Sequence, residues 1–256
     1  MICALLLGRS GSSGFPGKNT YSVLGRPLMS YPLIAAKKSK LVDRLYVSTD
    51  SAEIKNIGSE YGAEYIARPS ALCTDAALGE DAYKHGYEVI RDRLQEEKRS
   101  IELMVLLFAN APTVSADLID TGIRALRKDP KLDSAVTVSL YNMWSPLRAR
   151  KLGKDGCLHP FAPFESYGDP KTLNCDRDSQ GDALFADMGL SVVRPRCLEN
   201  IEEGLLPQKW MGQHIYPIEN WGGLDVDYEW QLPQAIFWLE AHGIKPKEKK
   251  IDEYLS

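Results

Sequence analysis

The sequence lacks the features that mark most metalloproteins, membrane proteins and nucleic-acid-binding proteins. Its five cysteines are scattered without a C-x-x-C pair, and its four histidines form no H-E-x-x-H motif. A zinc site or a disulfide framework is therefore not expected. The net charge of −4 disfavours nucleic-acid binding, because a phosphate backbone attracts a basic surface. No apolar run approaches the ~20 residues that cross a membrane, so we expect no membrane association.

The amino terminus also lacks the pattern of a secretory leader. Residues 1–7 contain no basic residue, and glycines follow at once, so we expect a cytoplasmic protein. Hydrophobic residues make up 44% of the chain and charged residues 26%, which is typical of a globular protein with a buried core. A length of 256 residues suits one domain, residues 1–256, with a single inserted excursion.

Apolar runs and amphipathic stretches alternate along most of the chain. Residues 2–7 (ICALLL) form a continuous apolar run before glycines, which is typical of a strand buried on both faces. Further strands are expected at 44–48, 64–66, 102–107 and 134–140, and helices at 27–38, 51–61, 75–97, 115–127 and 228–241. Asp50 or Ser51 is suited to cap the second helix. This alternation predicts an α/β fold whose mainly parallel sheet carries helices on both faces.

Between about residues 141 and 181 the alternation stops. The stretch is rich in proline, glycine and aspartate and has no sustained period. Because so long a structureless loop is unusual in a compact domain, we expect an inserted arm or lid, with regular structure returning at 183–193. The aromatic residues in the stretch include Trp144, Phe161, Phe164 and Tyr167. Rings that cannot be buried within one arm predict pairing with a second copy of the chain.

The segment after the first expected strand is rich in glycine and carries two cations. Glycines stand at positions 8, 11, 14 and 17, with Arg9 and Lys18 among them. Such a loop brings backbone N–H groups close to an anion, which favours phosphate recognition. The G-x-G-x-x-G pattern is absent, and the Walker pattern fails because Gly11 and Gly17 are one position too far apart. A flexible turn with solvated charges is the alternative.

Two aspartates stand at alternate positions just before the last expected helix. Asp225 and Asp227 follow a pair of glycines in the segment GGLDVD. In an extended chain, residues two apart point the same way, so both carboxylates can face one site. Mg²⁺ prefers hard oxygen ligands, often one or two carboxylates together with substrate phosphates and water. In the alternative interpretation Asp227 caps the helix and Asp225 is exposed.

The residues 8–19, GRSGSSGFPGKN, closely resemble the A-R-x-G-S-K-G-x-x-x-K-N signature of the CMP-sialic acid synthetases, the acylneuraminate cytidylyltransferases. Further segments resemble elements of the same family: V-S-T-D at 47–50, R-P followed by T-D at 68–69 and 74–75, and L-D-V-D at 224–227 in place of S-I-D-I-D. The resemblance runs from residue 2 to about residue 243. It implies a Rossmann-like three-layer α/β/α nucleotidyltransferase fold with a dimerisation arm.

The resemblance also implies an activity. It is the transfer of CMP from CTP to the hydroxyl of an acidic sugar, a sialic-acid-like nonulosonic acid or a Kdo-like sugar, with release of pyrophosphate. Mg²⁺ is the implied cofactor and a homodimer the implied working form. One alternative is a nucleotidyltransferase with another nucleotide or with a non-sugar or phosphonate acceptor. The other is a catalytically weak nucleotide-binding protein.

The positions that match the family give candidate site residues. Nucleotide binding is expected from Gly8, Arg9, Gly11, Ser12, Lys18, Asn19, Arg68, Asp75 and Ala109, acceptor binding from Asn110, Arg148 and Asp187, and metal binding from Asp225 and Asp227. Arg9, Lys18 and Asp227 are the expected catalytic residues. For Arg68 the alternative interpretation is an arginine that forms an ion pair at the surface. For Arg148 the alternative interpretation is a solvated position in a loop. Arg150 is a second candidate for the acceptor-binding role.

Two positions depart from the family pattern. Ser13 stands where the family has a lysine associated with the phosphates, so the loop lacks one cation. Phe108 stands where the family has a glutamine that helps to hold substrate, and both hydroxyls of its Q-x-T-S-P motif are absent from residues 108–112. The plain interpretation of Phe108 is a core or pocket-wall residue. We therefore expect an altered acceptor pocket.

Overall fold

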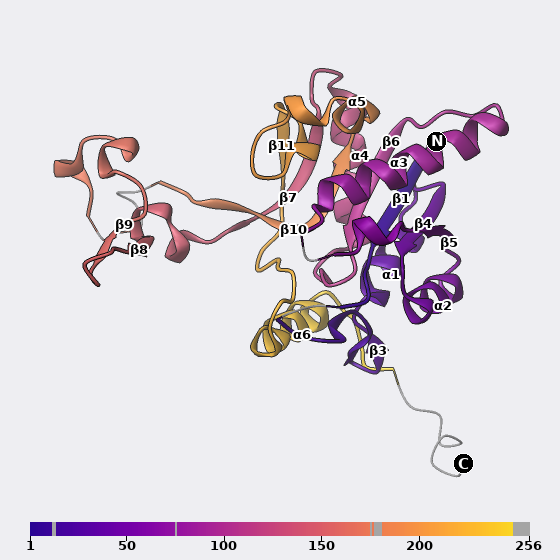
Figure 1. Cartoon of the computed structure of the whole chain (residues 1–256), viewed down its shortest axis with the longest axis horizontal. Coiled ribbons are helices and arrows are strands. Elements are labelled where there is room, and N and C mark those ends of the chain that lie inside the picture. The colour runs from indigo at the N-terminus through magenta and orange to yellow at the C-terminus, as the bar shows by residue number, and fades with distance from the viewer. Residues whose placement is uncertain (12–13, 75, 175, 177–180, 248–256) are drawn as a thin grey trace, which may run out of the picture.

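The computed structural model describes residues 1–11, 14–74, 76–174, 176 and 181–247. Its central sheet has the strand order β11-β7-β10-β6-β1-β4-β5 (Figure 1). The strands span Ile2–Leu7 (β1), Arg44–Thr49 (β4), Glu64–Ala67 (β5), Leu103–Phe108 (β6), Ser134–Leu140 (β7), Leu184–Val193 (β10) and Ile215–Glu219 (β11). β10 is antiparallel to both neighbours, whereas the other pairs are parallel. The expected mainly parallel sheet is confirmed.

β1 lies inside the parallel part of the sheet, and all its residues are buried. Its last residue, Leu7, is in register with Ser48 of β4 and Phe108 of β6. The loops after these three strands therefore begin at the same edge. In open α/β sheets, ligands bind in the crevice outside this carboxyl edge.

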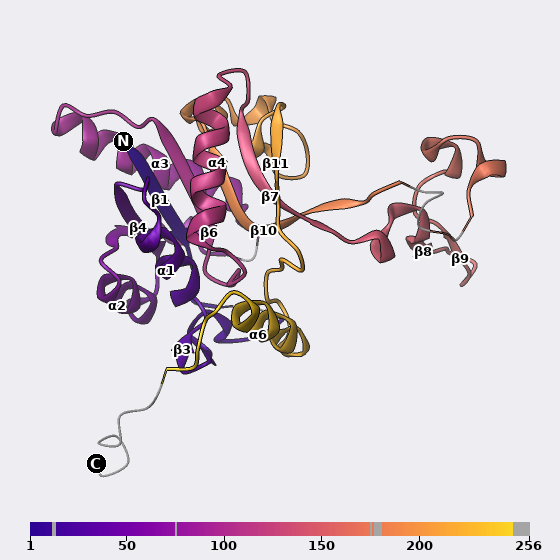
Figure 2. The ribbon, with the colours of Figure 1, turned by 180° about the vertical axis from the view of Figure 1, so that it is seen from behind.

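Helices cover both faces of the sheet and give the three expected layers (Figures 1 and 2). They are α1 (Ser30–Lys38), α2 (Ala52–Glu60), α3 (Gly79–Glu96), α4 (Ala116–Lys128) and α5 (Pro195–Glu199). Buried residues of α1, α2 and α4 form one cluster with Ile2 and Ala4, and those of α3 and α5 form another with Cys3 and Leu5. Alternate residues of β1 thus enter opposite cores. No helix in the described part of the chain is long and apolar enough to cross a membrane.

Serine side chains set the beginnings of two helices. Ser51 Oγ accepts a hydrogen bond from the N–H of Ile54, and Ser115 Oγ accepts one from Leu118, each at 3.3 Å. Such caps satisfy N–H groups that have no partner within the first turn. Ser51 rather than Asp50 is therefore the cap of α2.

Three expected helices begin at least three residues later than their patterns predicted. α1 begins at Ser30 because Arg26–Pro27 (β3) pairs with Ser22–Val23 (β2) in a short ribbon. α3 begins at Gly79 instead of residue 75. The last helix, α6, spans Leu232–Ala241 and follows a 3-10 turn.

α6 belongs to a third apolar cluster, which holds the segment before this helix in place. Leu224 and Val226 are buried in that cluster together with Trp238. Asp225 and Asp227 alternate with these two apolar residues, so their carboxylates point away from the cluster. Both aspartates therefore face the loop that follows β1.

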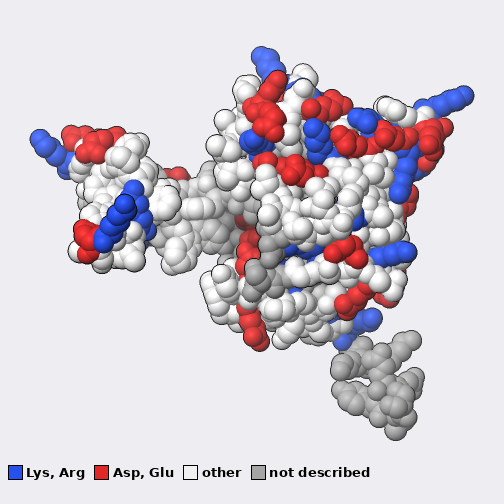
Figure 3. Space-filling model, in the orientation of Figure 1, with Lys and Arg blue, Asp and Glu red and all other residues white. Residues whose placement is uncertain are grey.

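The chain between β7 and β10 extends away from the sheet as an arm (Figure 1). Its tip contains a short hairpin of β8 (Arg150–Leu152) and β9 (Leu158–Pro160). A narrow neck joins the tip to the body, and on the face in Figure 3 it carries few charged side chains. Large apolar side chains are exposed along the arm: Met143, Trp144, Leu152, Leu158 and Phe161.

Candidate active site

A cavity of about 200 Å³ opens at the carboxyl edge of the sheet, between the loop after β1 and the segment after β5. Seven of the sequence-predicted residues line it: Gly8, Arg9, Gly11, Lys18, Asn19, Arg68 and Asn110. Apolar side chains, among them Leu72, Leu78 and Phe108, form another part of the wall. The cavity thus combines cations with an apolar surface, which suits a ligand with an anionic end and a flat apolar end.

The loop after β1 lies close to the neighbouring strand ends. A Cβ atom on Gly8 would lie 3.1 Å from Cβ of Ala109, so the close approach favours glycine. Ala109 is buried and its N–H donates to the carbonyl of Leu7 at 2.9 Å. Ala109 was predicted to bind nucleotide, but the structure places it beneath the loop as a support.

Asp50 fixes the beginning of this loop, a role that the sequence prediction missed. Its carboxylate accepts hydrogen bonds from the Ser10 N–H at 2.8 Å and from Ser10 Oγ at 2.6 Å. Burial alone would raise the pKa of Asp50, but these hydrogen bonds outweigh burial and lower the pKa. Further along, the Asn19 amide donates to the carbonyl of Arg9 at 3.3 Å. The two ends of the loop are therefore held together.

Arg68 is buried at the wall of the cavity, with 8% of its surface exposed. Its Nε donates to Ser48 Oγ at 3.2 Å, and its second amine donates to the carbonyl of Ser48. Burial lowers the pKa of Arg68, although a guanidinium stays charged in proteins. The alternative of a surface ion pair is wrong, because Arg68 is a buried cation beside the cavity.

The two aspartates meet Lys18 and Asn110 at the rim of the cavity. Lys18 Nζ forms an ion pair with Asp227 Oδ1. Asn110 Nδ2 lies 3.5 Å from Asp225 Oδ2, 3.4 Å from Asp227 Oδ1 and 3.2 Å from the Val226 carbonyl. The N–H of Val226 in turn donates to the Asn110 carbonyl at 2.8 Å. Asn110 therefore holds both carboxylates beside each other.

Asp227 does not act as a helix cap. Its own backbone N–H and that of Tyr228 donate to Gln231 Oε1, at 2.7 and 2.8 Å. Its carboxylate is engaged with Lys18 and Asn110 instead. The helix-cap interpretation of this residue is therefore wrong.

The pair of aspartates fits a divalent cation. Burial, and next the charge of Asp227, raise the pKa of Asp225, so a cation between the two carboxylates would relieve unfavourable charge. In the described residues no group of three or more His, Cys, Asp or Glu is arranged to hold a metal. A magnesium ion here would therefore take its other ligands from phosphate and water, as it commonly does.

Asp187 does not face the cavity, contrary to its predicted acceptor-binding role. It is 5% exposed, and its carboxylate is surrounded by hydrogen-bond donors from Thr137, Ser139, Gly189 and Asn220. Burial raises the pKa of Asp187 in spite of these hydrogen bonds. Because every side of the carboxylate is taken up by protein, no position is left for a sugar.

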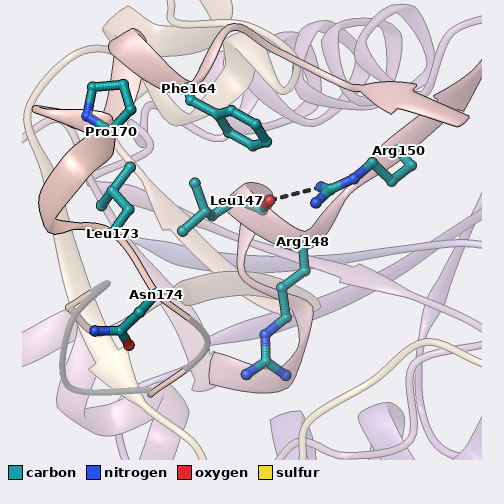
Figure 4. A pocket seen from close by; sticks show the side chains of 7 residues that line it. All are labelled: Leu147, Arg148, Arg150, Phe164, Pro170, Leu173 and Asn174. Atoms are coloured by element: carbon teal, nitrogen blue, oxygen red, sulfur yellow. Dashed lines mark hydrogen bonds between the residues drawn. The ribbon is translucent and has the colours of Figure 1, made fainter.

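Arg148 belongs to the 3-10 turn Pro146–Arg148, which is part of the arm that extends away from the sheet (Figure 1). With Arg150 and Phe164 it lines a separate cavity of about 270 Å³. Figure 4 shows Arg148 pointing away from Phe164, whereas the Arg150 guanidinium turns toward the Leu147 carbonyl at 2.8 Å. Neither arginine lines the cavity that contains Arg9 and Arg68.

Phe108 packs against Tyr83 and Trp210, with ring centroids 5.3 and 6.2 Å away. It also lines the cavity, so the pocket-wall interpretation is confirmed. Three positions lie outside the described residues. They are Ser12 and Asp75, which were predicted to bind nucleotide, and Ser13, which departs from the family pattern.

Solved structures of nucleotidyltransferases have the same architecture. A CMP:2-keto-3-deoxy-manno-octonic acid synthetase complexed with CTP matches with a TM-score of 0.65 at 17% identity, covering 94% of this chain and 99% of that one. A 4-diphosphocytidyl-2C-methyl-D-erythritol synthase from Anaerococcus prevotii matches with a TM-score of 0.59 at 14% identity, covering 93% and 96%. The chain thus has the three-layer α/β fold of the nucleotidyltransferases, as predicted.

Sequence comparison narrows the class to one family. The chain belongs to the cytidylyltransferase family, whose model matches residues 3–191. It is 35% identical over 91 residues to an N-acylneuraminate cytidylyltransferase of Escherichia coli O18:K1:H7, covering 36% of this chain and 22% of that protein. It is 26% identical over 233 residues to the N-acylneuraminate cytidylyltransferase of Oncorhynchus mykiss, covering 91% and 49%. The chain therefore spans less than half the length of these relatives.

Proposed function

We propose that this chain transfers CMP from CTP to a hydroxyl of an acidic sugar and releases pyrophosphate. The acceptor is a nonulosonic acid of the sialic-acid type or a Kdo-like sugar. The observation that carries the proposal is the placement of Arg9, Lys18 and Arg68 around a cavity whose rim holds Asp225 and Asp227. Cations suited to a triphosphate and carboxylates suited to its metal thus lie within one site.

The cavity suggests how CTP is oriented. The base and ribose would occupy the part between Leu72, Leu78 and Phe108, where apolar surface is available. The triphosphate would extend toward Arg9 and Lys18, where the glycine-rich loop allows close approach. The two ends of the nucleotide would thereby meet surfaces of matching polarity.

In the proposed reaction the acceptor hydroxyl oxygen attacks the α-phosphorus of CTP. A new P–O bond forms to the sugar, and the bond from the α-phosphorus to the bridging oxygen breaks. Pyrophosphate leaves with that electron pair, and the hydroxyl proton passes to solvent. Positioning and charge stabilisation provide most of the catalysis in such transfers. Arg9 and Lys18 would stabilise the charge that develops on the leaving pyrophosphate.

Mg²⁺ is the proposed cofactor, and Asp225 and Asp227 would hold it. When bound, it supplies neutralisation of phosphate charge and Lewis-acid polarisation of phosphate oxygens. Asn110 would keep both carboxylates oriented through its contacts with them. Lys18, now paired with Asp227, would be free to turn to the phosphates once a metal neutralises that carboxylate.

We further propose that the chain works as a homodimer through its arm. The exposed apolar side chains of the arm would be buried against the arm of a second copy, and two-fold pairing is the commonest solution. In such a dimer Arg148 would approach the acceptor of the partner subunit. A guanidinium can hold a sugar carboxylate with two hydrogen bonds.

Pyrophosphate release tests the proposal. The chain would be incubated with Mg²⁺, one nucleoside triphosphate at a time, and N-acetylneuraminic acid, pseudaminic acid or 3-deoxy-manno-octulosonate. Release with CTP and at least one of these acids is the expected result. Release with another nucleotide alone would contradict the proposed donor. Tight CTP binding without release across the panel would favour a catalytically weak nucleotide-binding protein.

A further inference from the structure

We propose that Asp187 is a positioning residue that anchors the turn at 220–224 and thereby sets the metal affinity of Asp225 and Asp227. The inference rests on the proposed function, because it concerns the site that would hold Mg²⁺. Asp187 itself is too deeply buried to contact substrate.

The Asp187 carboxylate is fully engaged with neighbouring elements. Oδ1 accepts hydrogen bonds from Thr137 Oγ1 at 2.5 Å and from the Gly189 N–H at 3.0 Å. Oδ2 accepts from Asn220 Nδ2 at 2.9 Å and lies 3.0 Å from Ser139 Oγ. All these donors are uncharged, so a charged carboxylate here is stabilised by hydrogen bonds alone. It joins β7, β10 and the residue after β11.

The same partners continue to the turn that carries the aspartates. Ser139 Oγ accepts a hydrogen bond from the Gly223 N–H at 2.9 Å. Asn220 Nδ2 also donates to the Thr113 carbonyl at 3.1 Å. Thr113 Oγ1 accepts from the Leu224 N–H at 2.9 Å, and Leu224 directly precedes the first aspartate. Hydrogen bonds therefore connect Asp187, through a few residues, with the segment that carries Asp225 and Asp227.

The turn packs directly on the carboxylate. A Cβ atom on Gly223 would lie 1.9 Å from Asp187 Oδ2 and 2.5 Å from Asn220 Nδ2. A larger residue at this position would have to displace the Asp187 and Asn220 side chains. The contact fixes how close the turn comes to Asp187. The directions of Asp225 and Asp227, which follow Leu224, depend on that distance.

Asp187→Asn is the informative substitution, because it keeps the volume and exchanges one acceptor for a donor. The new amide NH₂ would stand at the position of one of the two carboxylate oxygens and face the donors of that oxygen. These are Asn220 Nδ2 and Ser139 Oγ at Oδ2, and Thr137 Oγ1 and the Gly189 N–H at Oδ1. Asp120→Asn is the matched control. Asp120 is also buried, but it lies in α4 and accepts hydrogen bonds from Ser39, Lys40 and Arg124. Both variants are expected to lose stability.

The Mg²⁺ concentration that gives half-maximal turnover distinguishes the two. For Asp187→Asn we expect it to rise about 10-fold, since outer partners of metal ligands typically change metal affinity by 10–100-fold. The KM for CTP at saturating Mg²⁺ should stay unchanged, because the residues that bind CTP lie on other elements. Asp120→Asn should keep the wild-type Mg²⁺ requirement. A wild-type requirement in Asp187→Asn as well would overturn the proposal.

Hydrogen exchange gives a readout that needs neither metal nor turnover. In Asp187→Asn the amides of Gly223 and Leu224 should exchange faster, because their partners Ser139 and Thr113 are no longer held. In Asp120→Asn they should exchange as in the wild-type chain. Unchanged exchange in both variants would refute the anchor even if the wild-type chain turned over. A wild-type chain without turnover would refute the proposed function, and exchange would then decide the anchor by itself.

Discussion

Asp225 and Asp227 contact Lys18 and Asn110, which line the cavity, because the residues next to them are buried on the opposite side. Leu224 and Val226 are buried against α6, and the alternation of an extended chain turns the aspartates toward Lys18 and Asn110. The sequence alone predicts this alternation, as well as the glycine-rich loop. It does not predict the burial of Asp187, because a single aspartate in a strand has no distinguishing pattern.

Asp227→Asn should reduce turnover by about 10²–10³-fold, the range seen when one preorganised charge-stabilising group is lost. The neutral amide would bind both Mg²⁺ and Lys18 weakly, whereas the fold should persist because Asp227 is exposed. Steady-state kinetics across a Mg²⁺ titration measures the effect. Glu229→Gln, at an exposed carboxylate two residues on, is the control and should retain full activity. Near-normal turnover of Asp227→Asn at all Mg²⁺ concentrations would remove the metal assignment.

Gly14→Ala tests how closely the loop must lie to the aspartates. A Cβ atom on Gly14 would lie 2.8 Å from the Asp227 carbonyl oxygen, so the loop has to move away. We expect the KM for CTP to rise about 10-fold, which corresponds to ~1.4 kcal/mol of lost binding. Thermal unfolding should be nearly unchanged. An unaltered KM would mean that the approach of this loop to Asp227 has no part in CTP binding.

Among the helices and strands, the short apolar strands and the capped helices can be predicted from local sequence patterns, but β11 cannot. Its sequence, IYPIE, contains Pro217, which normally argues against a strand. β11 lies at the edge of the sheet and pairs only with β7, so a proline without an N–H is tolerated there. The antiparallel direction of β10 was also beyond prediction, since hydrophobic pattern carries no strand direction.

Asp133 fastens the start of β11 to β7, and its stabilising effect should depend on pH. Burial would raise the pKa of Asp133, but N–H groups of His214 and Gln213 and the Arg196 guanidinium lower it to about 2. A carboxyl with a lowered folded-state pKa stabilises the fold above its unfolded pKa, and that stability is lost as pH falls toward 2.

Asp133→Asn should therefore destabilise the chain by about 2 kcal/mol at pH 7. The variant and the wild-type chain should differ less in their free energy of unfolding as the pH falls from 4 to 2, where the wild-type carboxyl becomes protonated. Urea unfolding at several pH values measures it. A constant difference across that range would show that the loss comes from packing and not from the charge of Asp133.

In the whole molecule, the arm places Arg148 apart from the cavity that seven of the predicted site residues line. Arg148 resembles an acceptor ligand in sequence, yet it lies in the arm with Phe164 (Figure 4). A sequence cannot show whether an arm folds back or extends. Exposed Trp144 and Phe161 are consistent with an arm that needs a partner.

Light scattering at micromolar concentration should give twice the mass of one chain. Phe161→Asp should shift the population toward the monomer, because it places a charge in the proposed interface. Phe237→Asp is a matched control, since both rings are 64% exposed but Phe237 lies on α6. A persistent monomer with full activity would refute the arm-mediated dimer, as would equal dissociation in both variants.

Mixing two inactive variants tests whether the arm acts across the interface. A subunit with Asp227→Asn and a subunit with Arg148→Ala each lack one proposed component. A mixed dimer would contain one site in which both Asp227 and the partner's arginine are intact, so activity should return in part. If the mixture shows no activity, Arg148 acts in its own subunit or in no site at all.

Transfer of CMP can be followed directly through the phosphorus atoms of CTP, by ³¹P NMR in the presence of Mg²⁺ and an acidic sugar. We expect the α-phosphorus signal of CTP to move to that of a sugar phosphodiester while pyrophosphate appears in equal amount. Neither change should occur without the sugar, and both should be lost in Asp227→Asn. Phosphate appearing in place of pyrophosphate, or CTP consumed equally without any sugar, would contradict the transfer of CMP.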